Sequence, residues 1–318
     1  MERGYLKRLL IALGGNAILK AGQRGTIQEQ LSNVETTARK LAKLVASWYE
    51  VVITHGNGPQ VGNILIQNER AKEEVPAMPL DICGAQSQGL IGTLMEQVLS
   101  NEFKHMGKST EIAALLTQVV VDRADPAFIH PTKPIGPWLT PEEKQVAEKE
   151  GGHWIEDIKK GWRRVVASPM PLRIVNNGSI EALISQGVVV IACGGGGVPV
   201  IEDEKGNLHG VEAVIDKDLA SQCLALDIEA DIFLILTDVP AVYLNFGKDN
   251  QESINRIQAS AMRKLLEQKT FPAGTIGPKV EAAVRFVEMG GEKAVIAGLE
   301  QAEDALKGKT GTTILKDL

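Results

Sequence analysis

Three lysines stand in local contexts that could hold a phosphoryl group or another small anion. Lys133 lies between two prolines, and Lys279 stands at the start of a predicted helix, where an anionic ligand would compensate its unfavourable charge. Lys217 lies between Asp216 and Asp218, which could hold the lysine and help to arrange magnesium. The alternative is that all three are ordinary solvated surface lysines. Because phosphoryl transfer depends on positioning and charge neutralisation, such lysines are candidates for a phosphotransferase site.

Glycine-rich loops follow three of the predicted strands. Gly14 and Gly15 precede Asn16, Gly56 and Gly58 flank Asn57, and four consecutive glycines occupy 194–197. Each run alone could be a tight turn. In an open parallel sheet, however, ligands bind beyond the carboxyl ends of the strands, where glycine lets backbone N–H groups approach an anion. Three such loops together favour a phosphate or carboxylate site.

Several common nucleotide-binding signatures do not occur in the sequence. There is no Gly-x-x-x-x-Gly-Lys-Ser/Thr motif, and no Gly-x-Gly-x-x-Gly follows the first strand. The His-Arg-Asp and Asp-Phe-Gly motifs of protein kinases are also missing. These observations argue against a P-loop NTPase, a nicotinamide-binding domain and a protein kinase.

Short apolar runs alternate with amphipathic segments along the chain. The runs are rich in Val, Ile and Leu and predict buried strands at 9–13, 51–54, 112–121, 188–193, 231–237, 293–297 and 312–315. Apolar residues at helical spacing predict helices after Thr26, through Trp48, and near 81–103, 177–186, 217–226, 259–268 and 278–289. Alternation of this kind predicts an α/β fold, a doubly wound and mainly parallel sheet between two layers of helices.

One segment, at about 121–162, interrupts this alternation. It carries five prolines and three of the four tryptophans in the chain. Prolines at this density exclude a central strand or a long helix. We expect a single domain over 1–318 with this segment inserted as a lid or small protruding subdomain, and the tryptophans suggest an apolar core within it. A long surface loop is the alternative.

Composition limits the partners and the compartment. A net charge of −6 and an aromatic content of 4% argue against nucleic-acid and anionic-membrane partners. The three cysteines form no Cys-x-x-Cys pair, which argues against a zinc site or a disulfide framework and favours buried thiols. No signal-peptide pattern or membrane-spanning run is found, so we expect a cytoplasmic protein.

Eight motifs, in order along nearly the whole chain, resemble those of the carbamate kinases of the amino acid kinase superfamily. They are LGGNA (13–17), HGNGPQVG (55–62), DICGAQSQG (81–89), PTKPIGP (131–137), GGGGVP (194–199), VEAVIDKD (211–218), LTDV (236–239) and GPKVE (277–281). The resemblance implies a three-layer α/β/α sandwich with a protruding subdomain. It also implies a homodimer that uses magnesium and interconverts ADP plus carbamoyl phosphate with ATP plus carbamate.

The resemblance also assigns roles to individual residues. Those implied to surround carbamate or its phosphoryl group are Gly14, Gly15, Asn16, Gly56, Asn57 and Gly58. Lys133, Lys217 and Lys279 would neutralise the transferring phosphoryl group, and Asp216 would orient the lysines. The nucleotide side would comprise Gly194, Gly195, Asp238, Val239, Tyr243 and Gly277. No residue is assigned as a metal ligand.

Asn16 separates this chain from other amino acid kinases, which commonly carry lysine at that position. Lys133 would then supply the missing charge from the protruding segment. The chain departs from the family pattern at Thr275-Ile276, where a Ser-Met pair is more usual. Two alternatives remain: a kinase of another acid, such as acetylglutamate, and a catalytically silent nucleotide sensor on the same scaffold. A plain α/β protein with glycine turns is a third.

Overall fold

A large sheet forms the centre of the molecule. The computed structural model describes residues 7–317 except 21, 47–48, 159–160 and 273–275. The sheet has the strand order β15 (Arg256–Gln258), β17 (Thr312–Leu315), β16 (Lys293–Gly298), β12 (Ile232–Thr237), β1 (Lys7–Leu13), β2 (Tyr49–His55), β9 (Val189–Ile191) and β3 (Ile112–Ala114). Every pairing is parallel except β16 with β17. The predicted, mainly parallel sheet is confirmed.

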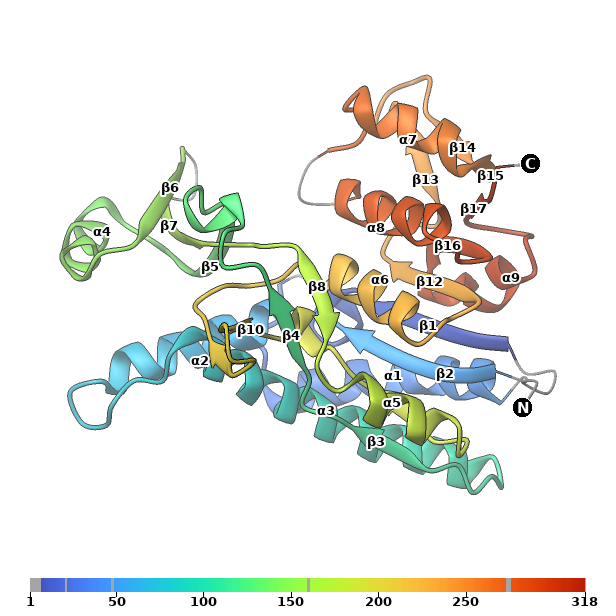
Figure 1. Cartoon of the computed structure of the whole chain (residues 1–318), viewed down its shortest axis with the longest axis horizontal. Coiled ribbons are helices and arrows are strands. Elements are labelled where there is room, and N and C mark those ends of the chain that lie inside the picture. Colours follow the sequence, from blue (N-terminus) through green and yellow to red (C-terminus); the bar gives the residue numbers. More distant parts are fainter. Residues whose placement is uncertain (1–6, 21, 47–48, 159–160, 273–275, 318) are drawn as a thin grey trace.

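Helices cover both faces of this sheet (Figure 1). Leu10 and Ala12 of β1 face a core formed with α5 (Asn177–Ile184), α6 (Lys217–Asp227), α7 (Ala259–Glu267) and α8 (Gly277–Glu288). Leu9, Ile11 and Leu13 face a second core formed with α1 (Ile27–Val45), α3 (Leu80–His105) and α9 (Ala302–Leu306). Successive side chains of a strand point to opposite faces, so one short apolar run contributes to both cores. The result is the predicted α/β/α sandwich.

Helix α1 illustrates how local sequence sets an element. Thr26 accepts a hydrogen bond from the Glu29 backbone N–H, and the Glu29 side chain accepts one from the Thr26 N–H, which completes a capping box. Its apolar stripe, which includes Val34, Ala38 and Leu41, is buried against the sheet. The predicted end of the stripe, Trp48, lies outside the described residues.

A second, smaller sheet corrects one predicted strand. Its order is β11 (Leu208–Gly210), β10 (Val198–Glu202), β4 (Gln118–Val121) and β8 (Pro171–Ile174). The run 112–121 is therefore two strands, β3 in the main sheet and β4 in this one. Between them, buried Thr117 accepts a hydrogen bond from the Cys193 N–H at its Oγ1, and its own N–H donates to Gln88 Oε1. These side-chain hydrogen bonds take the place of backbone hydrogen bonds between strands, and the chain leaves the first sheet here.

The proline-rich segment forms a projection from the main body (Figure 1). Its sheet has the order β5 (Lys133–Leu139), β7 (Gly161–Val166) and β6 (His153–Asp157), with α4 (Pro141–Ala147) between β5 and β6. Two prolines are tolerated in β5 because it is an edge strand. The last strand runs to Val166, beyond the predicted limit at 162. At the base, Asp125 accepts hydrogen bonds from the Ala127 and Met170 N–H groups, which joins the two ends of the projection.

The tryptophans of the projection do not form the separate buried core that their number suggested. All three are partly exposed, and Lys144 lies over the Trp162 ring at 4.7 Å. The buried apolar contacts lie instead at the base, where Ile135 and Val166 join a cluster with Val61 and Leu80 of the main body. Apolar burial therefore docks the projection onto its neighbours.

Several elements were not predicted. Helix α2 (Gly58–Ala71) begins within the second glycine loop. The strands β13 (Val242–Leu244) and β14 (Glu252–Ile254) form a small hairpin after β12. Three short 3₁₀ turns, η1 (Gly15–Ala17), η4 (Gly194–Gly196) and η5 (Leu299–Gln301), follow strands β1, β9 and β16.

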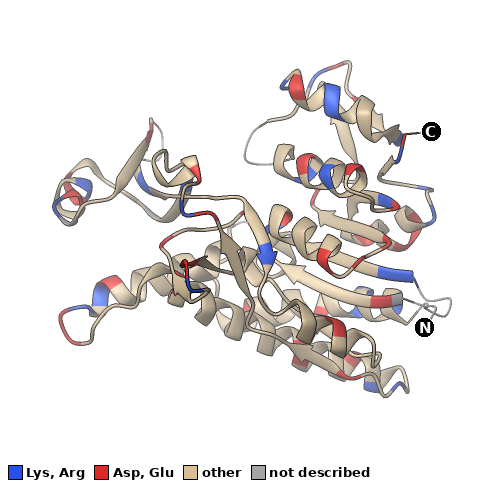
Figure 2. Cartoon of the chain, viewed as in Figure 1, with Lys and Arg blue, Asp and Glu red and all other residues tan. Residues whose placement is uncertain are grey.

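Charge is mixed over the molecule. Lysine and arginine positions are interspersed with acidic ones over the main body and the projection (Figure 2). Among the described helices, none combines the length and apolarity needed to cross a bilayer.

Candidate active site

Two of the candidate lysines share one buried carboxylate. Lys217 begins α6 and Lys279 lies in the first turn of α8, and these two helices pack against each other. Asp218 receives Lys217 Nζ at 2.5 Å on Oδ1 and Lys279 Nζ at 3.1 Å on Oδ2. The Asp218 side chain is 3% exposed. A single aspartate therefore fixes two ammonium groups side by side.

The pKa values of this cluster are set by burial and by mutual attraction. Burial would raise the pKa of Asp218, but Lys217 and Lys279 overcome that effect and lower it, so this carboxylate is charged. Burial lowers the pKa of Lys217, aided by the charge of Lys279 and opposed by Asp218. Lys217 and Lys279 carry two positive charges against the one negative charge of Asp218, so a bound anion would stabilise the cluster.

The third lysine arrives from the projection. Lys133, at the start of β5, donates from Nζ to Asp216 Oδ2 at 2.9 Å. The other oxygen of Asp216 caps α6 by accepting from the Asp218 N–H at 2.9 Å. Asp216 thus holds Lys133 at the beginning of the helix that carries Lys217 and Asp218. The structure brings together all four residues predicted as catalytic.

The first two glycine loops lie next to this lysine cluster. The Gly56 N–H donates to Leu13 O, so the ends of β1 and β2 stay together. A Cβ atom at Gly56 would lie 3.4 Å from Gly15 N and 3.5 Å from Lys217 Cδ. At Gly15 and Gly58, by contrast, a Cβ would meet no atom within 4 Å. Open space therefore adjoins backbone amides beside Lys217.

Helix α2 presents an uncapped N-terminus at the same place. Its N-cap residue, Asn57, makes no capping hydrogen bond, and its Nδ2 donates instead to Ser87 Oγ at 2.7 Å. Ser87 Oγ in turn donates to Gly84 O within α3. The free amides of an uncapped helix start favour an anion.

The third glycine loop packs against the second. A Cβ at Gly194 would lie 2.5 Å from the His55 ring, and one at Gly195 would lie 2.1 Å from Asn57 Nδ2. Gly195 also has a φ of +66°, which favours glycine. The structure therefore places Gly194 and Gly195 beside the predicted substrate loop, whereas the sequence assigned them to the nucleotide side.

The remaining predicted residues lie toward β12 and β13. Asp238 follows β12 and accepts a hydrogen bond from Asn16 Nδ2. Val239 is next in the chain, and Tyr243 lies in β13, where its ring centroid is 6.0 Å from that of Phe246. Gly277 begins α8, and its N–H donates a hydrogen bond to Pro272 O. Of the departure at Thr275-Ile276, Thr275 lies outside the described residues.

Comparison with known proteins agrees with these motifs. The sequence profile described as the amino acid kinase family matches residues 7–298. The chain belongs to the amino acid kinase family. A carbamate kinase of Pyrococcus furiosus is 50% identical over 313 residues, which cover 97% of this chain and 99% of that protein. A carbamate kinase of Trichomonas vaginalis is 44% identical over 97% of this chain and 99% of its own length.

A solved structure gives the same result for the fold of this amino acid kinase. The carbamate kinase of Giardia lamblia bound to AMP-PNP superposes with a TM-score of 0.93 at 43% identity, covering 98% of this chain and 99% of that one. The resemblance drawn from the eight motifs, the fold class and the kinase class are confirmed. The chain is a phosphotransferase.

The sequence named both Asp216 and Asp218 as residues that could hold Lys217, but only Asp216 was assigned to orient the lysines of this kinase. In the structure Asp216 contacts Lys133, while Asp218 holds Lys217 and Lys279. The available signal was the Asp-Lys-Asp order at the start of an amphipathic helix, which does not reveal which acid turns inward. Ser87 and Gln88 were not assigned as supports for Asn57 and Thr117, and both are buried polar residues of α3.

The acidic side chains of the site already accept hydrogen bonds from other protein groups. Asp216, Asp218 and Asp238 each accept a hydrogen bond from another side chain. Among the described residues there is no group of three or more His, Cys, Asp or Glu side chains able to hold a metal ion. Magnesium often binds through substrate phosphates and few protein ligands, so this donor set fits an ion delivered with a nucleotide.

Proposed function

We propose that the protein is a carbamate kinase, transferring a phosphoryl group reversibly between ATP and carbamate. The observation that carries this proposal is the convergence of Lys133, Lys217 and Lys279 on the paired acids Asp216 and Asp218. Its carbamate kinase relatives match it over nearly their whole length.

In the direction of ATP synthesis, the bond between the carbamate oxygen and phosphorus breaks. A terminal oxygen of ADP forms the new bond to phosphorus, and carbamate leaves as an anion. No proton has to move, so the site needs cations and positioned amides more than a general base. The histidine that ends β2 fits this view, because burial lowers the pKa of His55 to about 4 and keeps it neutral.

The residues divide the work by position. Gly14, Gly15, Asn16, Gly56, Asn57 and Gly58 would surround carbamate and its phosphoryl group, now joined by Gly194 and Gly195. The three lysines would exchange part of their contact with Asp216 and Asp218 for the phosphoryl oxygens as charge spreads over them. Because Asn16 is neutral, the cation that arrives with the projection, Lys133, completes the set.

The nucleotide would lie on the α8 side of β12. Asp238, Val239, Tyr243 and Gly277 are the proposed contacts, with magnesium on the phosphates. The AMP-PNP complex of the Giardia carbamate kinase supports an adenine nucleotide here. When bound, the metal would draw negative charge from the phosphates and help to orient them.

The wider setting is also part of the proposal. We infer a single domain over 1–318 with an inserted lid from about 121, a homodimer and a cytoplasmic location. The three cysteines support the location because all are buried free thiols. Light scattering of the purified chain tests the dimer.

The decisive experiment mixes the protein with ADP, magnesium and carbamoyl phosphate and follows ATP. ATP formation that disappears in Lys217→Met supports the proposal. ATP-dependent phosphorylation of acetylglutamate, with none of this activity, would instead establish another acid as the substrate. Nucleotide binding without turnover of either substrate would establish the silent sensor.

A further inference from the structure

Two hydroxyl groups lie in the core beside the lysine cluster. Thr54 is the last residue but one of β2, Ser221 lies one turn into α6, and both side chains are fully buried. Their hydroxyl oxygens are 2.6 Å apart. Ser221 Oγ also donates to the backbone carbonyl oxygen of Lys217 at 2.5 Å. A chain of two hydrogen bonds therefore runs from β2 to the backbone of Lys217.

The direction of the first bond follows from the number of protons. A serine hydroxyl has one hydrogen, and Ser221 gives it to the Lys217 carbonyl, which can only accept. Thr54 therefore donates to Ser221 Oγ. Both hydroxyls have a partner, so neither carries the cost of an unsatisfied buried polar group.

The side chains around the two hydroxyls are apolar. Thr54 follows Val52 on the same face of β2, and its neighbour on β1 is Ala12. Ala220 and Leu224 of α6 enter the same core. Valine and alanine would fill these two positions with apolar groups of nearly the same shape, so burial alone does not require hydroxyls there. What the hydroxyls add is a directional bond that fixes α6 against β2.

The placement of α6 against β2 sets the geometry of the phosphoryl site. Strand β2 leads into the second glycine loop, and α6 begins with Lys217. A Cβ atom at Gly56 would lie 3.5 Å from Lys217 Cδ. A small shift of α6 would therefore change the distance between Lys217 and the amides of this loop. In a catalytic site, a displacement of about 1 Å can lower the rate by roughly 100-fold.

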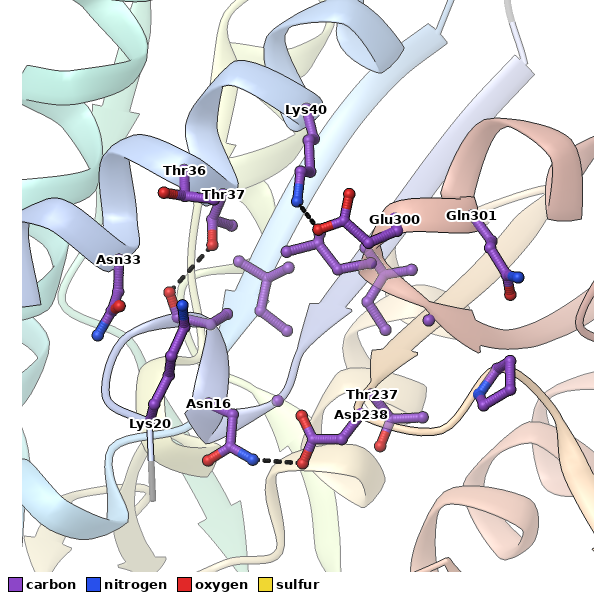
Figure 3. Close-up of a pocket in the computed structure, with 17 residues that line it drawn as sticks. Asn16, Lys20, Asn33, Thr36, Thr37, Lys40, Thr237, Asp238, Glu300 and Gln301 are labelled. Carbon is purple, nitrogen blue, oxygen red and sulfur yellow. Dashed lines mark hydrogen bonds and ion pairs between the residues drawn. The ribbon is translucent and has the colours of Figure 1, made fainter. Parts of the chain in front are cut away.

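The first glycine loop is held by other bonds (Figure 3). Asn16 Nδ2 donates to Asp238, and Thr37 Oγ1 of α1 donates to Ala17 O at 3.0 Å. All four residues line a cavity of about 490 Å³ between α1 and the turn η5, except that Asp238 and Asn16 also border the proposed substrate and nucleotide sides. These bonds fix the first loop to α1 and to the end of β12. The pair formed by Thr54 and Ser221 instead fixes the helix that carries Lys217.

We propose that Thr54 and Ser221 are positioning residues that hold Lys217 at the second glycine loop during phosphoryl transfer. This role rests on the proposed function, in which Lys217 contacts the transferring group. Because Lys217 would act on charge that develops in the transition state, its displacement lowers kcat more than it raises the KM for ADP.

Three variants separate the hydroxyl from the shape of the side chain. Thr54→Val keeps the shape and loses the bond, Thr54→Ser keeps the bond and loses a methyl group, and Thr54→Val/Ser221→Ala removes both hydroxyls. We expect kcat for ATP formation to fall about tenfold in Thr54→Val and in the double variant, because Lys217 is displaced rather than removed. The KM for ADP should stay within about twofold. Thr54→Ser should keep most of the wild-type kcat, although its Tm falls.

Val52→Ala is the matched control. It opens the same core two residues earlier on β2 and removes no side-chain hydrogen bond, so it should lower Tm and leave kcat unchanged. The double variant should lower Tm less than this control, because exchanging both partners of a buried hydrogen bond for apolar groups is nearly neutral.

The outcomes distinguish this role from a purely structural one. Wild-type kcat in Thr54→Val and in the double variant would overturn the proposal. So would a kcat that follows Tm across the series, with Thr54→Ser and Val52→Ala losing as much as Thr54→Val. A wild-type protein that makes no ATP from carbamoyl phosphate would refute the proposed function, and this role with it.

Discussion

Replacing Asp218 by asparagine removes one negative charge and preserves the shape of the side chain. In the native protein this carboxylate receives both Lys217 and Lys279, at 2.5 and 3.1 Å. After the change, two ammonium groups face each other beside a neutral amide. Asp216→Asn is the matched control, because it removes the same charge two residues earlier and leaves the Asp218 bridge intact.

The expected loss of stability follows from burial. The Asp218 side chain is 3% exposed, and its partners Lys217 and Lys279 are 13% and 16% exposed. Removing one member of a buried ion pair costs about 3–5 kcal/mol, because the remaining charge is left without compensation. The control breaks a pair in which Lys133 is 34% exposed, so water can solvate the freed lysine. We expect the control to cost about 1 kcal/mol or less.

The dependence on pH gives a second signature. Burial already lowers the pKa of Lys217, and Asp218 opposes that shift. Without the carboxylate, the pKa in the folded state falls further below its unfolded value. The unfolded variant then binds more protons than the folded one, so the variant loses additional stability as pH falls from about 10.5 toward neutrality.

Urea unfolding of the wild type and both variants, at pH 7 and pH 9.5, measures these differences. The gap between wild type and Asp218→Asn should be several times that of Asp216→Asn at pH 7 and should narrow at pH 9.5. If the free energy of unfolding of Asp218→Asn lies within about 1 kcal/mol of the wild-type value at pH 7, the loss is smaller than that of a broken buried ion pair. Asp218 then does not hold the two lysines. A gap that widens at pH 9.5 would equally refute the reasoning.

Three further changes test other parts of the site. Lys133→Met should lower kcat by roughly 100-fold, since a cation near the transferred group is lost, while Tm changes little. A large fall in Tm alongside the fall in kcat would show that Lys133 is structural. Because the pKa of His55 is lowered to about 4 by burial, wild type should lose roughly 3 kcal/mol as pH falls from 6.5 to 4. His55→Gln should lack that part of the loss in parallel urea titrations, and identical acid profiles would contradict it. Gly195→Ala should raise the KM for carbamoyl phosphate by displacing Asn57 and destabilise by about 1–3 kcal/mol, whereas Gly178→Ala, where a Cβ meets nothing within 4 Å, should be near neutral; equal Tm values would count against the close packing.

The sheet could be predicted because its strands are buried on both faces. Runs such as that of β12 are continuously apolar and bounded by polar residues, so their position follows from composition alone. The break at Thr117 could not be predicted in this way. The residues on both sides are equally β-forming, and only the distant partners Gln88 and Cys193 decide that the ladder stops there.

Helix α2 was missed for the opposite reason. Its first residues, Gly58 and Pro59, were interpreted as a loop, although proline at the first turn is compatible with a helix start. In the site, residue types identified the lysines, but the choice between Asp216 and Asp218 as their support depends on how α6 packs against α8. That packing joins residues that are distant in the sequence, so the spacing of residues within a motif does not predict it.

The pairing of β4 with β8 bears on how this architecture could have arisen. These strands enter and leave the projection, and they lie antiparallel, with Val121 opposite Pro171. The chain could therefore pass from one to the other through a tight turn, with both cores of the main body left as they are. The segment that brings Lys133 is thus inserted between two adjacent strands. Its removal would leave the two cores that face the main sheet, but it would uncover Val61 and Leu80, which Ile135 and Val166 now cover.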